Sequence, residues 1–465
     1  FNNKNVTFRD GVGIPIAKPY YRYQNPGGTI GGPLLIPGTR FNQSRTRLFF
    51  FFSEEYLHTL TTGGVNSYTM PTALERKGDF SQTVTTTGVR IPIKDPTTGT
   101  VLPDNILPAS RINPIGYGIL NLFPLPFTTD GTGRRQFNTQ YQFNRERPRE
   151  DRILRVDFAL GPKTASYLRL IQDFQADRGV GATLNGGGAW GQFSSNYDIQ
   201  SAGAAYTVIH TFRPNLILES LFGINRGTQH TYPTDDAKFR ATNDLSAIKG
   251  PDGRPVKLPN FFGANVLNLA PIVSFANNGA QSAGQGVTAP PTFGFDSRWP
   301  FYGTDQLTNI TSNLTWIKSK HTIKAGIYFE HNSRNASVYS TYNPAGSYWF
   351  GSDTANPNDT GYPFSNALAG TVQAYGEDNK KLFGHTRYNQ VEWFVQDTAR
   401  VTRRLTFDLG VRFQIIQPTF LKDGVLSMFQ GDAYDPAKTG QLLFPALVNG
   451  QKVALNQVTG ATYAF

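Results

Sequence analysis

The stretch V-E-W-F-V-Q-D-T-A-R-V-T-R-R-L-T-F-D-L-G-V-R-F-Q-I-I, residues 391–416, decides the fold class of this chain. Apolar and polar residues alternate strictly over residues 405–415 and more loosely over residues 391–400. A period of two indicates β-strands with one apolar and one polar face. The short polar link at residues 402–404 joins the two halves and predicts a hairpin. Each arm has about ten residues, which lets a tilted strand cross a bilayer.

The composition is consistent with a membrane wall built from such hairpins. The chain has 465 residues, of which 13% are aromatic, yet its mean hydropathy is only -0.36. No segment approaches the roughly 20 apolar residues of a spanning helix, and strands that are polar on alternate residues lower the mean hydropathy. A soluble all-β protein would share this low value. The absence of cysteine excludes disulfides and thiolate metal sites.

The charge balance is basic, with 44 Lys and Arg against 33 Asp and Glu, a formal net charge of +11. The cations are spread along the chain, with only short pairs such as Lys380 and Lys381. No basic run with interleaved aromatic residues and no nucleic-acid-binding module is present, so nucleic acid is not an expected partner. We expect the charge to face a polar lumen or anionic outer-leaflet lipid.

Hairpins with the same asymmetry recur along the chain. Their strands are predicted at 152–160 and 165–174, 200–212 and 216–226, and 305–317 and 322–333. Links of about three residues alternate with long links at about 175–199, 227–304, 334–387 and after 417. Short turns on one rim and long loops on the other are typical of bacterial outer-membrane barrels. In the competing account, a β-sandwich, strands usually have about five or six residues.

The N-terminal part is less regular. Two strands are predicted at about 27–36 and 47–57, followed by an irregular region at about 59–149. Within that region, residues 113–123 predict a short helix, because Asn113 can cap it and Pro114 suits its first turn. A link this long is usually functional or external.

An ordered set of sequence blocks resembles a known family. The blocks are G-G-T-I-G-G-P, L-F-F-F-F-S-E-E-Y, P-T-A-L-E-R-K-G-D-F-S, D-P-T-T-G, N-I-L-P-A-S-R-I-N-P, F-P-L-P and V-Q-D-T-A-R-V-T-R-R-L-T-F-D-L-G-V-R-F. Together they span residues 20 to about 417 and resemble the barrel of Oar-like TonB-dependent receptors. These are outer-membrane proteins of Gram-negative bacteria, abundant in acidobacteria, that carry a carboxypeptidase-regulatory-like domain before the plug.

The resemblance implies an all-β fold, an antiparallel transmembrane β-barrel of which about ten strands are present, with short periplasmic turns and long extracellular loops. We expect one partial barrel over residues 1–465. Its expected parts are first strands at 1–58, a long irregular loop region at 59–150, transmembrane hairpins at 151–417 and the start of a further long loop at 418–465. No signal peptide, TonB box, plug or C-terminal strands are recognisable, so we expect a piece of a longer protein.

The resemblance also implies a function. Such receptors import a large or scarce ligand, for example an oligosaccharide, a siderophore or a peptide, and involve no covalent chemistry. We therefore expect no enzyme activity, no catalytic residues and no cofactor. The expected partners are outer-membrane lipid, the ligand, and the TonB complex through parts missing from this chain. Two alternatives are an outer-membrane adhesin or structural barrel without transport, and a soluble secreted β-protein such as a carbohydrate-active enzyme.

Aromatic residues in the long links are the candidate ligand contacts, because rings beside Asn, Asp and Gly can stack on sugars or chelators. The candidates are Tyr348, Trp349, Phe350, Trp299 and Tyr302. Alternatively, these rings belong to an interfacial aromatic girdle or pack the loops on themselves.

Metal binding is not expected from the sequence. The six histidines form no H-x-x-x-H or H-E-x-x-H pattern. His230 lies near Asp235 and Asp236, but a solvated loop is the better interpretation. The acidic stretch at 353–359 does not follow the calcium-loop pattern.

Overall fold

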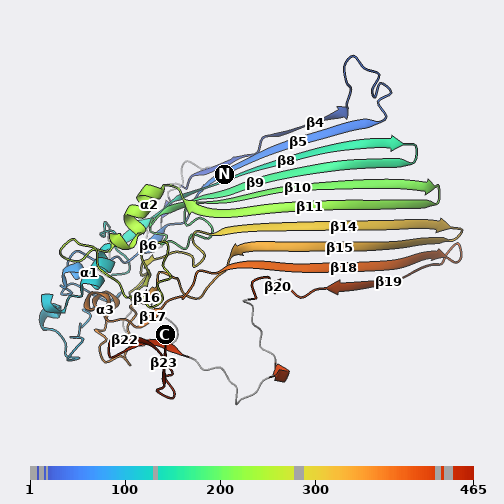
Figure 1. The fold of residues 1–465 in the computed structure, drawn as a ribbon. Helices are drawn as coiled ribbons and strands as arrows, with labels where there is room; N and C mark the ends of the chain where they lie inside the picture. The colour runs from blue at the N-terminus through green and yellow to red at the C-terminus, as the bar shows by residue number, and fades with distance from the viewer. Residues whose placement is uncertain are drawn as a thin grey trace.

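The computed structural model describes residues 8–9, 15–16, 19–128, 135–276, 287–424, 431–433 and 443–464. Its main element is a 12-stranded antiparallel sheet in which the strands follow the order β19-β18-β15-β14-β11-β10-β9-β8-β5, with β3 and β4 paired to β5 and β20 paired to β18 (Figure 1). Its strands are β3 (Tyr21–Gln24), β4 (Gly27–Pro33), β5 (Leu48–Thr62), β8 (Asn144–Gly161), β9 (Thr164–Val180), β10 (Ser194–Arg213), β11 (Leu216–Pro233), β14 (Tyr302–Lys318), β15 (His321–Ser337), β18 (Phe383–Arg400), β19 (Thr406–Ile416) and β20 (Phe420–Leu421). The described edge strands do not pair with each other, so the sheet is open.

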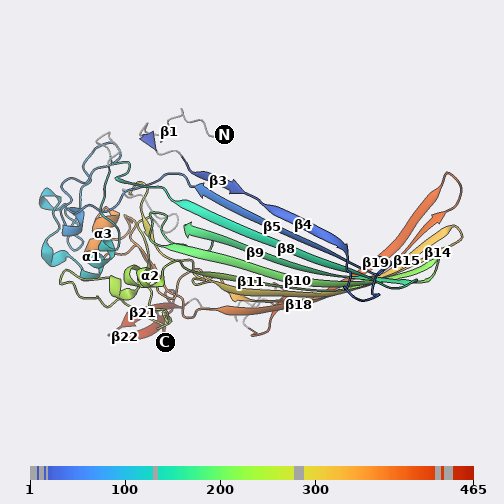
Figure 2. The same ribbon diagram turned by 90° about the horizontal axis from the view of Figure 1, so that it is seen from above.

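All four predicted hairpins are present, which confirms the transmembrane hairpin pattern. The strands run further than the alternation predicted, however, and the long links shrink to residues 181–193, 234–301 and 338–382. Most of the added strand residues are polar on both faces, so these segments show no period of two. The sheet is a curved and twisted wall when seen from above, as Figure 2 shows, because strands have an intrinsic right-handed twist.

The register gives the sheet two chemically different faces. Directly paired residues lie on the same face, so a row of cross-strand partners can be followed through the wall. One such row is Gly32, Phe50, Val156, Leu168, Tyr206, Phe222, Ile310, Phe329, Val391 and Ile415. The neighbouring row on the opposite face contains Asp157, Tyr167, Thr207, Leu221, Thr311, Tyr328, Glu392 and Gln414. The first row is apolar and faces lipid, and the second is largely polar and faces the lumen.

The apolar band covers only the half of the wall nearest the short turns. Two rows above Val156 towards the loops, the lipid-side row contains Arg152, Gln172, Ala202, Arg226, Gln306, Ser333 and Arg387. Strand β10 has 20 residues, roughly twice the 9 to 11 needed to cross a bilayer at a tilt. The loop-side half of the wall therefore stands above the membrane in water.

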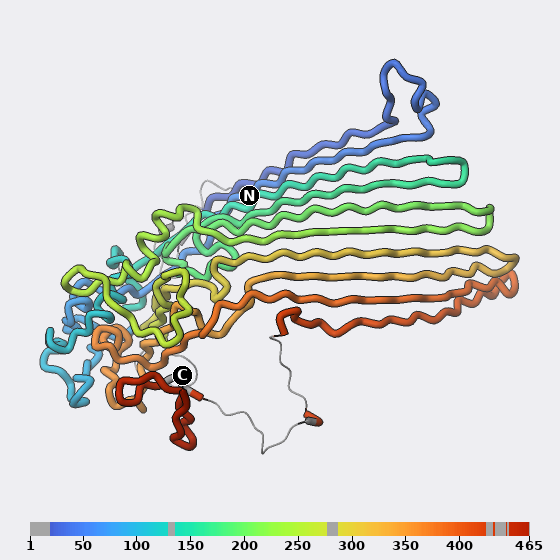
Figure 3. The backbone as a smooth tube through the Cα atoms, in the orientation of Figure 1, coloured from blue at the N-terminus to red at the C-terminus, as the bar shows by residue number. Residues whose placement is uncertain are grey.

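The two ends of the wall differ in their connections. The short turns 162–163, 214–215, 319–320 and 401–405 lie at one end together with the longer link 34–47, and the links 63–143, 181–193, 234–301 and 338–382 lie at the other, as the tube in Figure 3 shows. We call the described residues of the four long links, 63–128, 135–143, 181–193, 234–276, 287–301 and 338–382, the loop domain. No described helix is long and apolar enough to cross a membrane.

The loop domain has its own regular elements. They are the strands β6 (Asn66–Tyr68), β7 (Thr139–Tyr141), β12 (Ile272–Ser274), β13 (Thr292–Phe293), β16 (Ser347–Trp349) and β17 (Ala374–Gly376), the α-helices α1 (Pro114–Asn121), α2 (Asp236–Asn243) and α3 (Pro363–Ala369), and the 3-10 turns η1 (Glu75–Lys77), η2 (Pro103–Asn105), η3 (Ala109–Arg111) and η4 (Leu245–Ala247). Helix α1 confirms the predicted helix, and its cap Asn113 accepts hydrogen bonds from two backbone amides. The region predicted as irregular is thus a folded unit.

Smaller elements lie outside these two parts. They are β1 (Phe8–Arg9), β2 (Pro15–Ile16), η5 (Gly431–Ala433), β21 (Phe444–Val448), β22 (Gln451–Leu455) and β23 (Thr462–Ala464). The last three form a small antiparallel sheet, and Lys452 on β22 donates hydrogen bonds to the carbonyls of Asn260 and Phe261. Residues 425–430 and 434–442 of the expected C-terminal loop, and residues 1–7, 10–14 and 17–18 of the expected first strands, lie outside the described residues.

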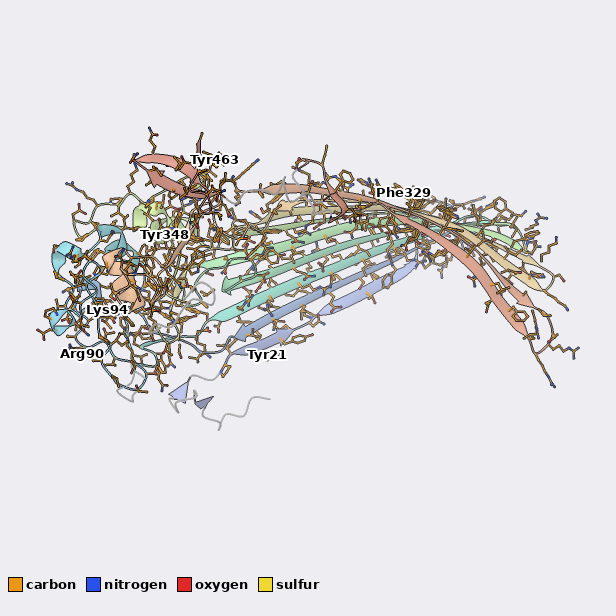
Figure 4. The ribbon with its side chains drawn as sticks, turned by 90° about the horizontal axis from the view of Figure 1, so that it is seen from below. Tyr21, Arg90, Lys94, Phe329, Tyr348 and Tyr463 are labelled. Atoms are coloured by element: carbon orange, nitrogen blue, oxygen red, sulfur yellow. The ribbon has the colours of Figure 1, made fainter. Side chains whose placement is uncertain are left out.

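The main hydrophobic core lies in the loop domain and not in the wall. Each of the four long links contributes buried side chains to it, including Phe80, Ile93 and Phe123; Trp190 and Phe193; Phe239, Ile248 and Phe275; and Tyr362, Phe364 and Leu368. A single-layer wall has no second layer to cover its apolar face, which leaves residues such as Ile327 exposed. Figure 4 labels Phe329 on this wall and Tyr348 within the loop domain.

Replacing Ile327 with Arg tests the lipid-facing assignment. Ile327 lies in the middle of the apolar band and is 59% exposed on the chain, so a charge there would enter hydrocarbon. We expect Ile327→Arg to lower the free energy of unfolding of the full-length protein in vesicles by about 2–4 kcal/mol. Thr311→Arg, on the lumen face, is the matched control and should change it little. Equal effects of the two variants, measured by urea unfolding, would contradict the assignment of faces.

Candidate functional site

The loop domain is held together by contacts between links that are distant in sequence. Helix α1 from the first long link packs against α3 from the last one, and the Asn113 amide donates a 2.8 Å hydrogen bond to the carbonyl of Leu368. The approach is close because Gly116 has no side chain: a Cβ there would stand 1.7 Å from the carbonyl oxygen of Ala367. The two helices therefore fix one link against the other.

A buried ion pair lies beneath these helices. The guanidinium of Arg135 donates to both carboxylate oxygens of Glu75, with one contact at 2.7 Å, and Glu75 is 1% exposed. Glu75 also accepts hydrogen bonds from the Thr72 amide and the Thr83 hydroxyl, each at 2.8 Å. Every carboxylate oxygen is thus satisfied, as a buried charge requires.

The same arginine connects two links through aromatic rings. The Arg135 guanidinium carbon lies 5.8 Å from the ring centre of Tyr362 and 5.9 Å from that of Phe364. Cations within about 6 Å of a ring face are attracted by its quadrupole. Arg135 therefore ties the first long link to the last one.

The ion pair sets the ionisation of Glu75. Burial by itself would raise the pKa of this carboxyl group, but the charge and hydrogen bonds of Arg135, helped by Thr72 and Thr83, outweigh burial and lower the pKa below its usual value. The group is therefore ionised at neutral pH. Its stabilising contribution is complete above the unfolded-state pKa, about 4.3, and is lost as the pH falls through the lower pKa of the folded state.

Three of the five predicted ligand contacts lie inside this core. Trp299 is 4% exposed, Tyr348 is 8% exposed and Phe350 is 2% exposed. Tyr348 stacks on Phe350 with ring centres 6.1 Å apart, and Trp299 meets Phe193 at 5.0 Å. Burial raises the pKa of the Tyr348 hydroxyl to about 12. These rings pack the loops on themselves, which is the alternative that the sequence left open.

The other two predicted contacts retain accessible ring surface. Trp349 ends β16, is partly buried, and meets Tyr342 edge-on at 5.9 Å. Tyr302 begins β14, is 47% exposed, and stacks on Phe383 at 6.4 Å. The register places Tyr302 on the same side of the wall as the lipid-facing row, above the membrane. Ligand contact stays a prediction, and Trp349 is the candidate that belongs to the loop domain.

The lumen face of the wall carries a polar network. Glu392 on β18 accepts hydrogen bonds from Arg412, Gln390 and Gln414. Glu330 on the neighbouring strand accepts one from Tyr328 and one of 2.6 Å from Tyr388. Of these groups, Glu392, Arg412 and Tyr328 line an open depression, together with Glu219, Thr311, Asn313, Thr315, Lys324, Phe394 and the edge of Ile327. Such a surface suits water and hydrophilic solutes.

Charges continue on the lumen side above the membrane. Asp177 on β9 pairs with Arg145 and Arg147 of β8 and accepts a 2.7 Å hydrogen bond from the hydroxyl of Thr183. Arg149 pairs with Asp173 at 3.1 Å and with Asp151 at 2.9 Å. The paired charges make this part of the wall polar without a large excess of either sign.

The described residues contain no group of three or more metal-ligating side chains. His230 packs on Tyr232 with ring centres 5.0 Å apart. Asp359, from the acidic stretch, accepts hydrogen bonds from Ser352 and Asn366, both at 2.7 Å. These contacts are those of a structural carboxylate inside the loop domain.

The pairing of Glu75 with Arg135 was not predicted from the sequence. One local signal was available, because Thr72 and Glu75 have the spacing of a capping box, and each bonds the backbone amide of the other. Nothing in the local sequence indicates Arg135 as the partner, which lies 60 residues away.

The family model described as "Outer membrane beta barrel domain" matches residues 1–462. The chain belongs to this outer-membrane β-barrel family. Membership places the protein in the outer membrane, and it agrees with the lipid-facing and lumen-facing rows of the wall. Comparison with curated proteins gives no match.

Three solved structures align with this chain at low TM-scores. The outer membrane transporter YddB from Escherichia coli aligns with TM-score 0.39 and 8% identity over 85% of this chain and 34% of its own. The siderophore receptor PiuA from Acinetobacter baumannii aligns with TM-score 0.30 and 9% identity, over 88% and 58% respectively. The ferric preacinetobactin receptor BauA from the same organism gives TM-score 0.27 and 9% identity, over 86% and 51%. The chain thus spans between about one third and three fifths of their lengths.

Substituting Glu75 tests the buried ion pair of this barrel protein. Glu75→Gln leaves the charge of Arg135 buried and unpaired, so we expect the loop domain to lose about 3–5 kcal/mol of stability. The native protein should become less stable below about pH 4, where Glu75 becomes protonated, and the variant should not show this loss. Thermal unfolding between pH 3 and 7, followed by the fluorescence of the core tryptophans, measures both effects. The exposed Asp236→Asn is the control, and a matching response of the two variants would refute the role of the pair.

Substituting Gly116 tests the contact between α1 and α3. In Gly116→Ala the new methyl group meets backbone, which cannot rotate away, so we expect the helices to separate and the loop domain to lose at least about 2 kcal/mol. Gly64→Ala is the matched control, because a Cβ at Gly64 would meet nothing within 4 Å. The rate of tryptic cleavage in the loops reports the difference. Equal cleavage of both variants and the native protein would show that the close approach is unimportant.

Proposed function

We propose that this chain is part of the barrel wall and loop region of a TonB-dependent receptor that imports a hydrophilic ligand. The observation that carries the proposal is the folded loop domain that continues a wall with a polar lumen face. A barrel that only resists mechanical stress needs no elaborate loop structure, whereas a receptor needs a shaped surface above its pore. The ordered sequence blocks support the Oar-like subtype.

The lumen wall supports a hydrophilic cargo. Its side chains, such as Glu392, Arg412 and Tyr328, are hydrogen-bonded to one another and present both charges. A solute that exchanges hydrogen bonds with such groups retains partners as it leaves water. This favours an oligosaccharide, a siderophore or a peptide over an apolar compound. No catalytic step is part of the proposal.

The packing of the loops supports a site that binds its ligand without a large ordering of the loop backbone. The loop core buries aromatic side chains from all four links. The conformation of the loop-domain surface is therefore largely fixed before a ligand binds. Preorganisation lowers the conformational entropy lost on binding. Energy coupling would act through a plug and a TonB box, which belong to other parts of a complete receptor.

The import hypothesis is tested with the full-length gene. Cells with and without the gene are offered labelled ferric siderophores, maltodextrins and peptides, with and without a protonophore. Uptake of one probe that needs both the gene and the proton gradient is the expected result. Surface binding without uptake would favour the adhesin alternative, and no gene-dependent binding of any probe would reject the proposal.

Trp349 is the proposed ligand contact. Its ring is partly exposed at the end of β16, and stacking on a flat or sugar ligand would remove it from water. We expect Trp349→Ala to weaken binding of the imported probe at least tenfold, roughly 1.4 kcal/mol. Tyr302→Ala tests the other accessible candidate, and Phe127→Ala, an exposed ring of the first link, is the control. Unchanged binding by Trp349→Ala, measured by equilibrium titration, would remove Trp349 from the site.

A further inference from the structure

The short-link end of the wall has an unusual charge distribution. We call residues 34–47, 161–164, 213–216, 318–321 and 400–406 the turn rim; the first range is a link, and the other four are turns together with the strand residue on either side. The turn rim contains ten Lys and Arg and no Asp or Glu. The ten cations are Arg40, Arg45, Arg47, Lys163, Arg213, Lys318, Lys320, Arg400, Arg403 and Arg404. Each of the five links contributes at least one.

The excess charge of the chain is concentrated at this end. The formal net charge of the chain is +11. The four long links, residues 63–143, 181–193, 234–301 and 338–382, hold 15 Lys and Arg against 14 Asp and Glu and are nearly neutral. The turn rim therefore accounts for almost the whole positive balance.

The cations of the turn rim are available for an external partner. All ten residues are exposed, and none of them forms an ion pair with a described residue of the chain. Lys163 and Lys320 donate single hydrogen bonds of 3.3 Å and 3.2 Å to backbone carbonyls. The Lys318 ammonium lies 5.0 Å from the ring centre of Trp316. These contacts orient the side chains but neutralise no charge.

The turn rim begins where the lipid-facing band ends. On the lipid side, the last apolar residues of the strands next to the turns are exposed, with Leu160 at 62%, Phe212 at 47% and Leu405 at 44%. Cations that follow such residues directly lie at the depth of lipid headgroups, and Trp beside Lys is typical of that interface. Short turns of outer-membrane barrels face the periplasm, so the headgroups at this depth belong to the inner leaflet.

We propose that the turn rim binds the phosphate groups of anionic phospholipids in the inner leaflet of the outer membrane. Unpaired Lys and Arg close to an anionic leaflet are attracted to it. The spacing of the charges favours lipid, because cations on every link suit a continuous ring of headgroups, whereas a single protein partner would need a compact cluster. The proposal rests on membership of the barrel family and is independent of the proposed import.

A charge-neutralised variant of the full-length protein tests this proposal. The variant carries Lys318→Gln, Lys320→Gln, Arg400→Gln, Arg403→Gln and Arg404→Gln. The matched control neutralises five exposed cations of the loop domain, Arg90→Gln, Lys94→Gln, Lys249→Gln, Arg254→Gln and Lys257→Gln. Figure 4 labels Arg90 and Lys94 at the end of the molecule away from the turns. A third variant, Arg400→Lys, Arg403→Lys and Arg404→Lys, keeps the charge.

The measurement is the phosphatidylglycerol retained per protein after detergent extraction from vesicles of phosphatidylethanolamine and phosphatidylglycerol. We expect the neutralised variant to retain at least about fivefold less, since one cation near an anionic surface contributes about 1 kcal/mol. The control and the charge-keeping variant should retain the native amount, and added salt should reduce retention by all folded forms. Heat-modifiable gel migration verifies that each variant is folded.

Three outcomes would overturn the proposal. Native retention of phosphatidylglycerol by the folded neutralised variant would show that the turn rim does not hold lipid phosphate. Equal losses in the loop-domain control would show that total charge, and not the position of the charge, determines retention. If the native protein instead captures soluble peptidoglycan fragments through the same residues while its lipid retention is unchanged by neutralisation, the occupant is the cell-wall polymer and the lipid assignment is wrong.

Discussion

The wall depends on one constraint, which is that every backbone amide and carbonyl inside hydrocarbon must find a partner on a neighbouring strand. The ladder runs without a gap from Gly32 on β4 to Ile415 on β19. Because side chains alternate along each strand, this ladder leaves one face for lipid and the other for the lumen. The edges of the described sheet have unpaired groups, so a complete barrel needs further strands to close it.

A wall made of a single sheet has no second layer against which to bury its side chains. The main hydrophobic core therefore lies in the loop domain. The large buried residues gather in the long links, where Phe123, Phe275 and Phe364 from three different links pack together. Loops usually lie on the surface because their backbone groups need partners. Here short strands, three α-helices and the Glu75 pair provide those partners, so the links fold as a unit above the membrane.

Charge follows the same division of the molecule. Along the lumen wall and inside the loop domain, carboxylates such as Asp177, Glu392 and Glu75 lie against arginines, because partly desolvated charges need partners. At the turn rim the cations lie at the membrane surface and have no such partners in the described chain. The two ends of the wall therefore lie in different surroundings. Charges are paired at the loop end and, among the described residues, unpaired at the turn end.

The sequence alone determined the elements that a local pattern encodes. Lipid imposes a period of two on each crossing strand, so the hairpins and the barrel class could be predicted from residues 391–416 outward, and the cap of α1 could be predicted from Asn113. Only the tertiary structure decided how far the strands extend beyond the membrane, since polar residues in water need not alternate. It also decided that Trp299 and Phe350 lie in a core and that Glu75 meets Arg135. Such contacts join links that lie far apart in the chain, and no local periodicity encodes which distant side chain will fill a given space.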